Sequence, residues 1–200
     1  MIKKSTKKDA GEQMITVPAI GRKKFTVMVV GDTPLICHAW SKKAIQMMLD
    51  KQMKKAKTGK EAKNPESDFQ ESLYHLPDGK FGFKCSAFKQ AAVAACRFID
   101  GVAMTEARGA FYVLGDFTEI LGGKPVMRED MVRLNGKVSD IRYRGEFKNW
   151  KCKLTIEYNA SVISPEQIIN LLNNAGFGVG VGEWRPDRNG TFGMFHVETK

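Results

Sequence analysis

The residues most suggestive of chemistry form a glycine-rich stretch at positions 176–193, which reads Gly-Phe-Gly-Val-Gly-Val-Gly-Glu-Trp-Arg-Pro-Asp-Arg-Asn-Gly-Thr-Phe-Gly. Unhindered backbone N–H groups in such a run can form a concavity that binds anions. Trp184, Arg185 and Arg188 follow closely, and an aromatic ring beside guanidinium groups suits stacked bases and phosphates. The stretch predicts a phosphate-bearing ligand, although glycines also permit close packing against another part of the same protein.

Neither familiar nucleotide-binding loop fits this stretch. The P-loop ends in Gly-Lys-Ser/Thr, and the dinucleotide fingerprint lies between a strand and a following helix. Here a predicted helix precedes the glycines and a predicted strand follows them. The ligand is therefore not expected to be a mononucleotide held in one of those two ways.

A second stretch, residues 124–153, interleaves aromatic residues with basic ones. Its candidate binding residues are Arg142, Tyr143, Arg144, Trp150 and Lys151. Rings that stack on bases, placed beside cations that meet phosphates, are typical of proteins that bind single strands. The same pattern is equally compatible with an exposed β-hairpin held by ordinary cross-strand pairs.

Catalysis would need general acid–base groups, and the three histidines, His38, His75 and His196, are the candidates. They lie far apart in the sequence, and nothing in the sequence indicates that they converge. The carboxylates show no Asp-x-Asp or His-x-x-Glu spacing that would suggest a metal site. We expect no catalytic residues, no metal and no cofactor.

Three helices and several strands are expected to position these residues. A β-branched run at 25–30 predicts a strand, and Ser41 can cap a helix whose polar face carries Lys42 and Lys43. Ser86 opens a second helix with an alanine-rich stripe, and Lys89 and Arg97 at its edges could flank a binding groove.

The third helix has the clearest start, because Ser164, Pro165 and Gln167 form a capping-box sequence with proline at the first helical position. Gly176 is expected to end this helix, and residues 192–197 read as the last strand. Further strands are predicted at 110–114, 117–120 and 151–158. Residues 1–24 read as a flexible basic arm, and 25–200 as one domain with insertions around 57–80 and 101–150.

The bulk composition indicates an intracellular protein with a negatively charged partner. The chain has 32 Lys and Arg against 22 Asp and Glu, a formal charge of +10, which favours a polyanion. The four cysteines share no metal-binding spacing and read as reduced thiols in a cytoplasmic protein. No apolar run reaches the length of a membrane span, so no membrane partner is expected.

The order of predicted elements suits an α+β fold: a ferredoxin-like or RRM-like antiparallel sheet with helices on one face and inserted β-hairpins. The glycine-rich stretch and its preceding helix resemble the glycine-rich loop of the CRISPR-associated RAMP superfamily. Residues 30–36 (Val-Gly-Asp-Thr-Pro-Leu-Ile) and 83–92 (Phe-Lys-Cys-Ser-Ala-Phe-Lys-Gln-Ala-Ala) are similar to that family's first strand-turn and helix entry. The chain is shorter than typical backbone members of the family, and its size also resembles small accessory proteins of bacteriophages.

The resemblance implies an RRM-like fold and a protein that holds the backbone of a single-stranded nucleic acid, RNA or DNA, as repeated subunits. It implies that Gly178, Gly180 and Gly182 are the close-approach residues, followed by the charges of Arg185 and Arg188. The alternatives are a RAMP-type RNA endonuclease, and a basic inhibitor or interaction protein that binds an acidic protein.

Overall fold

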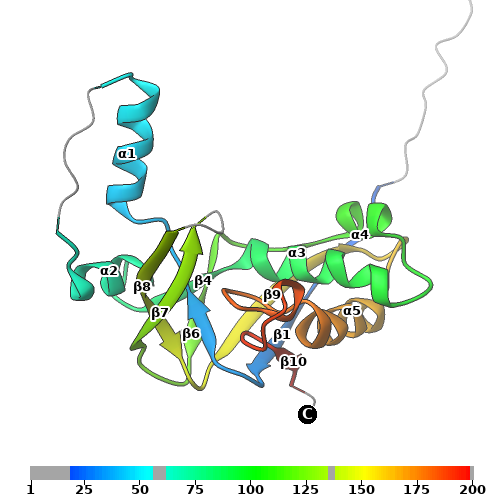
Figure 1. The fold of residues 1–200 in the computed structure, drawn as a ribbon. Helices are drawn as coiled ribbons and strands as arrows, with labels where there is room; N and C mark the ends of the chain where they lie inside the picture. Colours follow the sequence, from blue (N-terminus) through cyan, green and yellow to red (C-terminus); the bar gives the residue numbers. More distant parts are fainter. Residues whose placement is uncertain (1–18, 56–61, 135–137, 199–200) are drawn as a thin grey trace, which may run out of the picture.

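The computed structural model describes residues 19–55, 62–134 and 138–198. The predicted arm lies mostly outside these ranges, and so do parts of the predicted insertions. Two sheets and five α-helices make up the described chain (Figure 1).

The main sheet is antiparallel and has the order β10-β1-β9-β6-β4-β3, with β5 also paired to β9. Its first three strands, counted from one edge inward, are β10 (Phe195–Val197), β1 (Arg22–Gly31) and β9 (Lys151–Asn159). The remaining strands are β5 (Phe111–Val113), β6 (Phe117–Leu121), β4 (Phe81–Lys84) and β3 (Tyr74–His75). A last strand beside the first, and the first beside the third of four, is the strand order of a ferredoxin-like fold, which confirms the predicted fold class.

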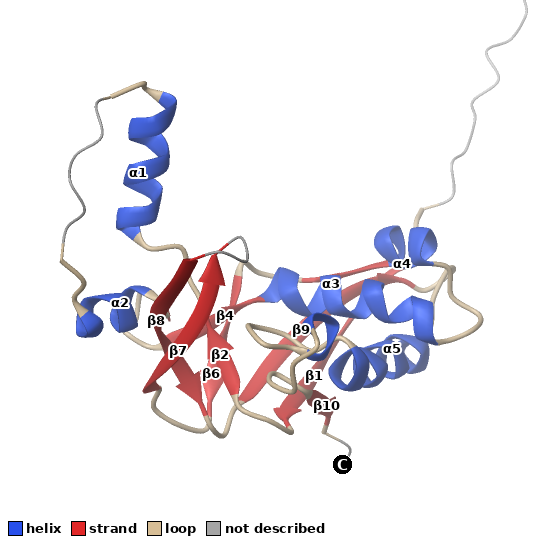
Figure 2. Ribbon diagram, in the orientation of Figure 1, coloured by secondary structure: helices blue, strands red, loops and turns tan. Residues whose placement is uncertain are grey.

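Helices cover one face of this sheet. Figure 2 shows α3 (Cys85–Ala95) and α5 (Pro165–Gly178) lying against the same side, with α4 (Met104–Ala110) and the short helix η1 (Cys96–Phe98) beside them. Alternate residues of β9, namely Cys152, Leu154 and Ile156, are fully buried beneath these helices. The other face of β9 carries polar side chains, so the sheet has one covered side and one open side.

A smaller sheet stands beside the main one. It pairs β2 (Leu35–Cys37) with β8 (Val138–Phe147), and β8 with β7 (Val126–Leu134) as a hairpin. The helix α2 (Pro65–Glu71) packs against this hairpin. An inserted hairpin was part of the predicted fold class, and β7–β8 lies in the region where the sequence placed an insertion.

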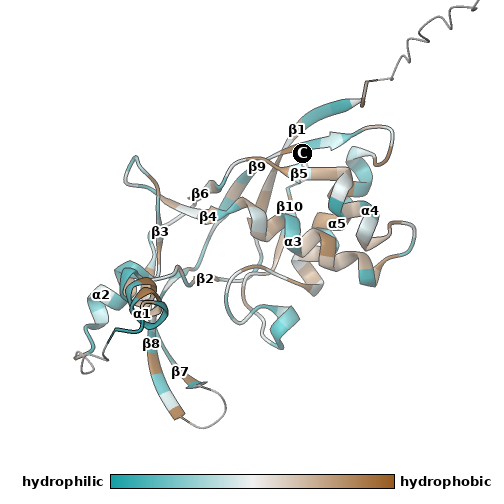
Figure 3. Ribbon diagram, turned by 90° about the horizontal axis from the view of Figure 1, so that it is seen from above, coloured by the Kyte–Doolittle hydropathy of each residue, from teal (hydrophilic) through white to brown (hydrophobic). Residues whose placement is uncertain are grey.

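The helix α1 (Lys42–Gln52) begins at the predicted cap, since the Ser41 hydroxyl accepts a hydrogen bond from the N–H of Ala44. It projects away from both sheets, and none of its residues, all of which are described, is buried. In Figure 3 it is seen nearly end-on and carries both apolar and polar segments. Its apolar stripe, including Ile45 and Met48, is therefore exposed.

Three predicted boundaries were wrong. Arg22, Lys23 and Lys24, assigned to the N-terminal arm, pair with β9 as the start of β1. The helix α5 continues past Gly176 to Gly178. Gly176 does not end the helix but permits close packing, since a Cβ there would lie 1.6 Å from the carbonyl oxygen of Phe195. The last strand is shorter than expected and begins at Phe195.

Candidate nucleic-acid interface

The glycine-rich loop leaves α5 and folds back on itself before β10. The N–H of Val181 donates to the carbonyl of Gly193 at 2.9 Å, and the N–H of Phe192 donates to that of Trp184 at 3.0 Å. A short helix η2 (Pro186–Arg188) forms the turn of this loop. The N–H of Glu183 donates to the carbonyl of Ile36 in β2, so the loop is also fixed to the smaller sheet.

The predicted close-approach glycines lie against the protein itself. A Cβ on Gly182 would lie 2.6 Å from the carbonyl oxygen of Ile36, and one on Gly180 would lie 2.7 Å from Cδ of Pro186. A Cβ on Gly178 would meet the ring of Phe98 at 3.0 Å. Gly180 and Gly182 also have positive φ angles, of 67° and 80°. Internal packing and backbone conformation therefore account for these three glycines.

A groove of about 300 Å³ runs between α3 and the glycine-rich loop. Small residues make it possible, because α3 presents alanines and the loop presents glycines on the two sides. The lining residues are Ala87, Gln90, Ala91, Ala94, Val179, Gly180, Val181, Gly182, Arg185 and Asp187. The loop and the second predicted helix thus line the same groove.

Positive charge gathers at the groove around one carboxylate. Asp187 pairs with Arg97 of η1 and lies 3.6 Å from Arg185, whose guanidinium also donates to the carbonyl of Gly182. The hydrogen bond from Arg97 is the main reason that the pKa of Asp187 is lowered from its ordinary value. Arg188 is exposed, and no ion pair holds it within the described chain. Three guanidinium groups against the carboxylates of Asp187 and Glu183 leave this region net positive.

Unpaired backbone donors accompany this charge. Glu183 N–H is bonded to Ile36, but neither the N–H of Gly182 nor that of Trp184 donates to an acceptor in the described ranges. Trp184 itself has a left-handed backbone, with φ of 53°, and its side chain is exposed. Successive N–H groups in such turns form anion-binding concavities. The two unpaired N–H groups flank the N–H of Glu183, which is engaged with Ile36.

A chain of charged residues joins the loop to the hairpin. Glu183 lies 3.1 Å from Nδ1 of His38 and 3.8 Å from the guanidinium of Arg144 on β8. The hydrogen bond to His38 is the main reason that the pKa of Glu183 is lowered. Arg144 lies in turn 3.3 Å from Asp130 on β7. Sequence reasoning missed this connection, since its four members are dispersed over two strands and two loops and show no spacing pattern.

The structure does not arrange the basic and aromatic residues at 142–151 as an exposed stacking row. Trp150 is 2% exposed and donates to the carbonyl of Thr33, so its ring belongs to the core. Arg144 is 5% exposed, and Tyr143 packs partly against the core. Arg142 and Lys151 remain accessible, but each pairs with a carboxylate, Asp140 and Glu198 respectively. Ordinary cross-strand pairing describes this segment better.

The other predicted lysines are also placed apart from the groove. Lys42 and Lys43 lie on the projecting helix α1. Lys89 turns inward: its ammonium group donates to the carbonyls of Ala107 and Phe111 and lies 3.5 Å from the centre of the Phe111 ring. Burial lowers the pKa of Lys89 to about 8. Lys89 thus fastens α3 to α4 and β5.

The three histidines do not converge. His38 pairs with Glu183, His196 with Asp32 at 2.6 Å, and His75 with the backbone carbonyl of Gln70. Within the described residues no three His, Cys, Asp or Glu side chains are grouped to hold a metal ion. The described part of the chain also includes no helix long and apolar enough to cross a membrane.

No family model matches the sequence, and no curated protein matches it significantly. Solved structures do show similarity. A chain of the Type III-B Cmr-beta complex, determined by cryo-EM bound to cognate target RNA, matches with a TM-score of 0.58 and 10% identity. The match covers 90% of this chain but only 60% of the length of the Cmr-beta chain.

Cmr6 from Pyrococcus furiosus is also similar, with a TM-score of 0.49 and 9% identity, over 90% of this chain and 100% of that one. At such low identity the likeness to the Cmr-beta chain concerns the fold alone. Together with the strand order of the main sheet, the likeness to the Cmr-beta chain shows that this protein has an RRM-like α+β fold similar to that of the Cmr-beta chain.

Proposed function

We propose that the protein is a non-catalytic binder of single-stranded nucleic acid whose strand lies in the groove between α3 and the glycine-rich loop. The observation that carries the proposal is the composition of that groove. Arg185 lines the groove, Arg97 and Arg188 lie near its Asp187 carboxylate, and the N–H groups of Gly182 and Trp184 are unpaired within the described chain. A strand of phosphates matches both features.

Exposed rings near the glycine-rich loop favour a single strand over a duplex. Phe98 is 53% exposed, with the Arg97 guanidinium 4.7 Å from its ring centre, and Trp184 is 39% exposed. Bases can stack on such rings only when they are not paired within a duplex. RNA is the first ligand to test, because the similar Cmr-beta complex was determined bound to target RNA. Single-stranded DNA has the same charge and bases and is the matched comparison.

Repeated subunits along the strand belong to the same proposal. A groove of about 300 Å³ spans only a short piece of a strand. Several copies side by side would be needed to hold a longer one. Size-exclusion chromatography with light scattering, with and without a long oligonucleotide, measures whether copies assemble in proportion to strand length.

The test is fluorescence anisotropy with labelled single-stranded RNA, single-stranded DNA and duplex of equal length, at two salt concentrations. The double variant Arg185→Ala/Arg188→Ala should bind single strands at least tenfold more weakly. It should also flatten the plot of log affinity against log salt by about 0.7 for each lost phosphate contact.

The matched control is Lys124→Ala/Arg133→Ala, which removes the same charge from exposed positions outside the groove lining. If the two double variants behave alike, binding is a general effect of net charge and the groove is not the site. If the protein binds an acidic protein and single-stranded oligonucleotides do not compete for that binding, the acidic protein partner is favoured instead.

A ribonuclease is the second candidate, and one observation favours it. Glu183 holds Nδ1 of His38 at 3.1 Å, next to the proposed groove, and a carboxylate that orients a histidine is a common feature of general acid–base sites. Running the bound RNA on a gel after incubation decides between the candidates. Cleavage by the wild type that is lost in His38→Ala would show an enzyme, whereas intact RNA supports a binding protein.

A further inference from the structure

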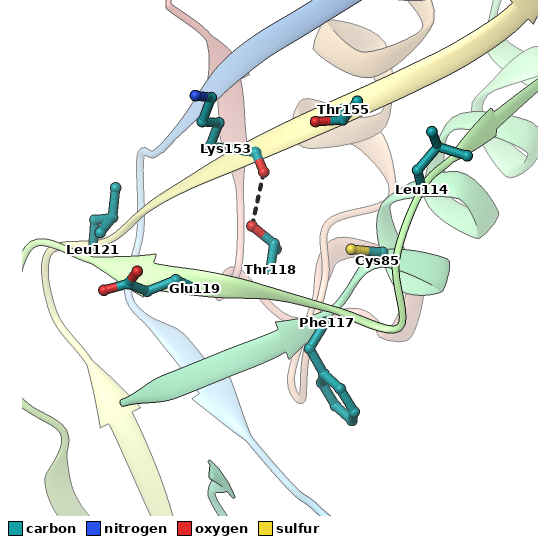
Figure 4. Close-up of a pocket in the computed structure, with 8 residues that line it drawn as sticks. All are labelled: Cys85, Leu114, Phe117, Thr118, Glu119, Leu121, Lys153 and Thr155. Carbon is teal, nitrogen blue, oxygen red and sulfur yellow. Dashed lines mark hydrogen bonds between the residues drawn. The ribbon is translucent and has the colours of Figure 1, made fainter. Parts of the chain in front are cut away.

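The open side of the main sheet contains a second hollow, of about 310 Å³, between β5, β6 and β9 (Figure 4). Its origin is a gap in strand pairing. β5 pairs with β9 as far as Val113 opposite Ile156, whereas β6 pairs with β9 only from Ile120 opposite Cys152 to Leu121 opposite Lys151. Between these points Thr118 bridges the gap, since its hydroxyl donates to the carbonyl of Lys153 at 2.8 Å. The hollow therefore opens over the middle of β9.

This hollow lies on the opposite side of the sheet from the groove. Along β9, Leu154 points into the helix-covered core, whereas Lys153 and Thr155 alternate with it and line the hollow. Along β6, Phe117 and Leu121 are likewise exposed, and Ile120 is buried. The open side is thus available to a ligand that never contacts the glycine-rich loop.

Charge on this side is positive at the hollow. Glu119 also lines it, but Lys80 neutralises its carboxylate at 2.9 Å. Lys24, further along β1, is likewise paired, with Glu157 at 3.6 Å. Lys153, by contrast, is exposed and has no carboxylate partner in the described ranges. The nearby carboxylates are already paired with other lysines. The free ammonium of Lys153 beside a polar hollow therefore suits a phosphate as its partner.

Exposed aromatic rings lie on the strands that flank the hollow, and Figure 4 shows the ring of Phe117 pointing away from β9, to the β4 side of β6. Phe117 is 43% exposed, and its ring centre lies 5.5 Å from that of Tyr74, over which the ammonium of Lys84 sits at 5.5 Å. Tyr112 of β5 is 54% exposed on the other side of the gap. The volume is at the lower end for small-molecule sites, roughly 300 Å³, which leaves room for one base. Stacking surface, hydroxyl groups and a free cation are the parts that a single nucleotide needs.

We propose that this hollow binds one nucleotide of a single-stranded nucleic acid, with its base against Phe117 and its phosphate on Lys153. The inference rests on the proposed function for its class of ligand, and adds a contact on the opposite side of the sheet from the groove. A strand that uses both sites passes around the edge of the subunit.

Photocrosslinking tests the site directly. Single-stranded oligonucleotides carrying 5-iodouridine are irradiated with the full-length protein, and the crosslinked peptides are mapped by mass spectrometry. We expect crosslinks in the peptide containing Phe117, reduced at least fivefold in Lys153→Ala. The control Lys24→Ala removes an already paired lysine from the same side of the sheet and should leave the crosslink unchanged. Phe117→Leu keeps an apolar side chain and should abolish it.

The outcomes separate the two proposals. Crosslinks confined to groove peptides, such as those with Phe98 or Trp184, would overturn the second site and leave the proposed function standing. A Phe117 crosslink that survives Lys153→Ala would overturn the phosphate contact. If anisotropy detects no binding to any single strand, both proposals fail. Thermal melts of each variant confirm that a lost crosslink is not lost folding.

Discussion

The guanidinium of Arg144 lies 3.8 Å from the carboxylate of Glu183, and this ion pair ties the β7–β8 hairpin to the glycine-rich loop. Arg144 is nearly inaccessible to solvent and also reaches Asp130 at 3.3 Å, while Arg128 of the same hairpin lies 4.5 Å from the ring centre of Phe192. The loop that lines the groove is therefore held from outside as well as by its own hydrogen bonds.

Arg144→Met should destabilise the protein by about 3 kcal/mol, because it leaves the buried Asp130 with less compensation. Urea denaturation measures the free energy of unfolding. Arg142→Met is the matched control, since Arg142 lies two residues away on β8 and pairs with Asp140 in a more exposed position. That change should cost at most about 0.5 kcal/mol. Equal losses in the two variants would contradict a structural role for Arg144.

Gly182→Ala should be markedly more destabilising than Gly79→Ala, although the two glycines have nearly the same φ, 80° and 79°. An alanine at either position has a backbone penalty of about 1 kcal/mol. Only at Gly182 would the new methyl group also lie 2.6 Å from the Ile36 carbonyl, whereas nothing lies within 4 Å at Gly79. Denaturation of both variants isolates the effect of close packing. Similar losses would mean that the loop can move away from β2.

The stability of the protein should depend on pH through Lys89, because burial lowers the pKa of this residue to about 8. In the unfolded chain this amine keeps its proton up to its ordinary value of 10.5. Between about pH 8 and 10.5 the unfolded state binds more protons, so this group makes stability rise with pH there. Lys89→Met should show a smaller rise than the wild type in unfolding experiments across this range. Parallel profiles would show that Lys89 has no lowered pKa.

Tryptophan fluorescence should report the groove through Trp184. Trp150 is 2% exposed, and Trp184 is 39% exposed on the proposed binding loop. A bound strand should therefore quench only part of the emission, and Trp184→Phe should remove that quenching. Trp40→Phe is the control, because Trp40 is 67% exposed but precedes the projecting helix α1. Quenching that persists in Trp184→Phe and vanishes in Trp40→Phe would move the site toward α1.

The sequence by itself determined the local elements whose interactions span a few residues. The capping box of Ser164 and Gln167 forms as predicted, and so does the Ser41 cap of α1. The alternation of β9 is visible in the sequence for the same reason, because each side chain faces the side of the sheet that its position in the strand dictates. These elements in their order were sufficient to predict the fold class.

Tertiary structure decided what those elements face. Trp150 lies in the core because Thr33, 117 residues away, accepts its N–H, and the apolar stripe of α1 stays exposed because no described element packs on it. The glycine pattern was visible in the sequence, but only the folded chain shows that Gly182 meets Ile36 while the neighbouring N–H groups remain open. Such contacts join segments far apart in the chain, so residue type and spacing identify candidates for a site and the packing selects among them.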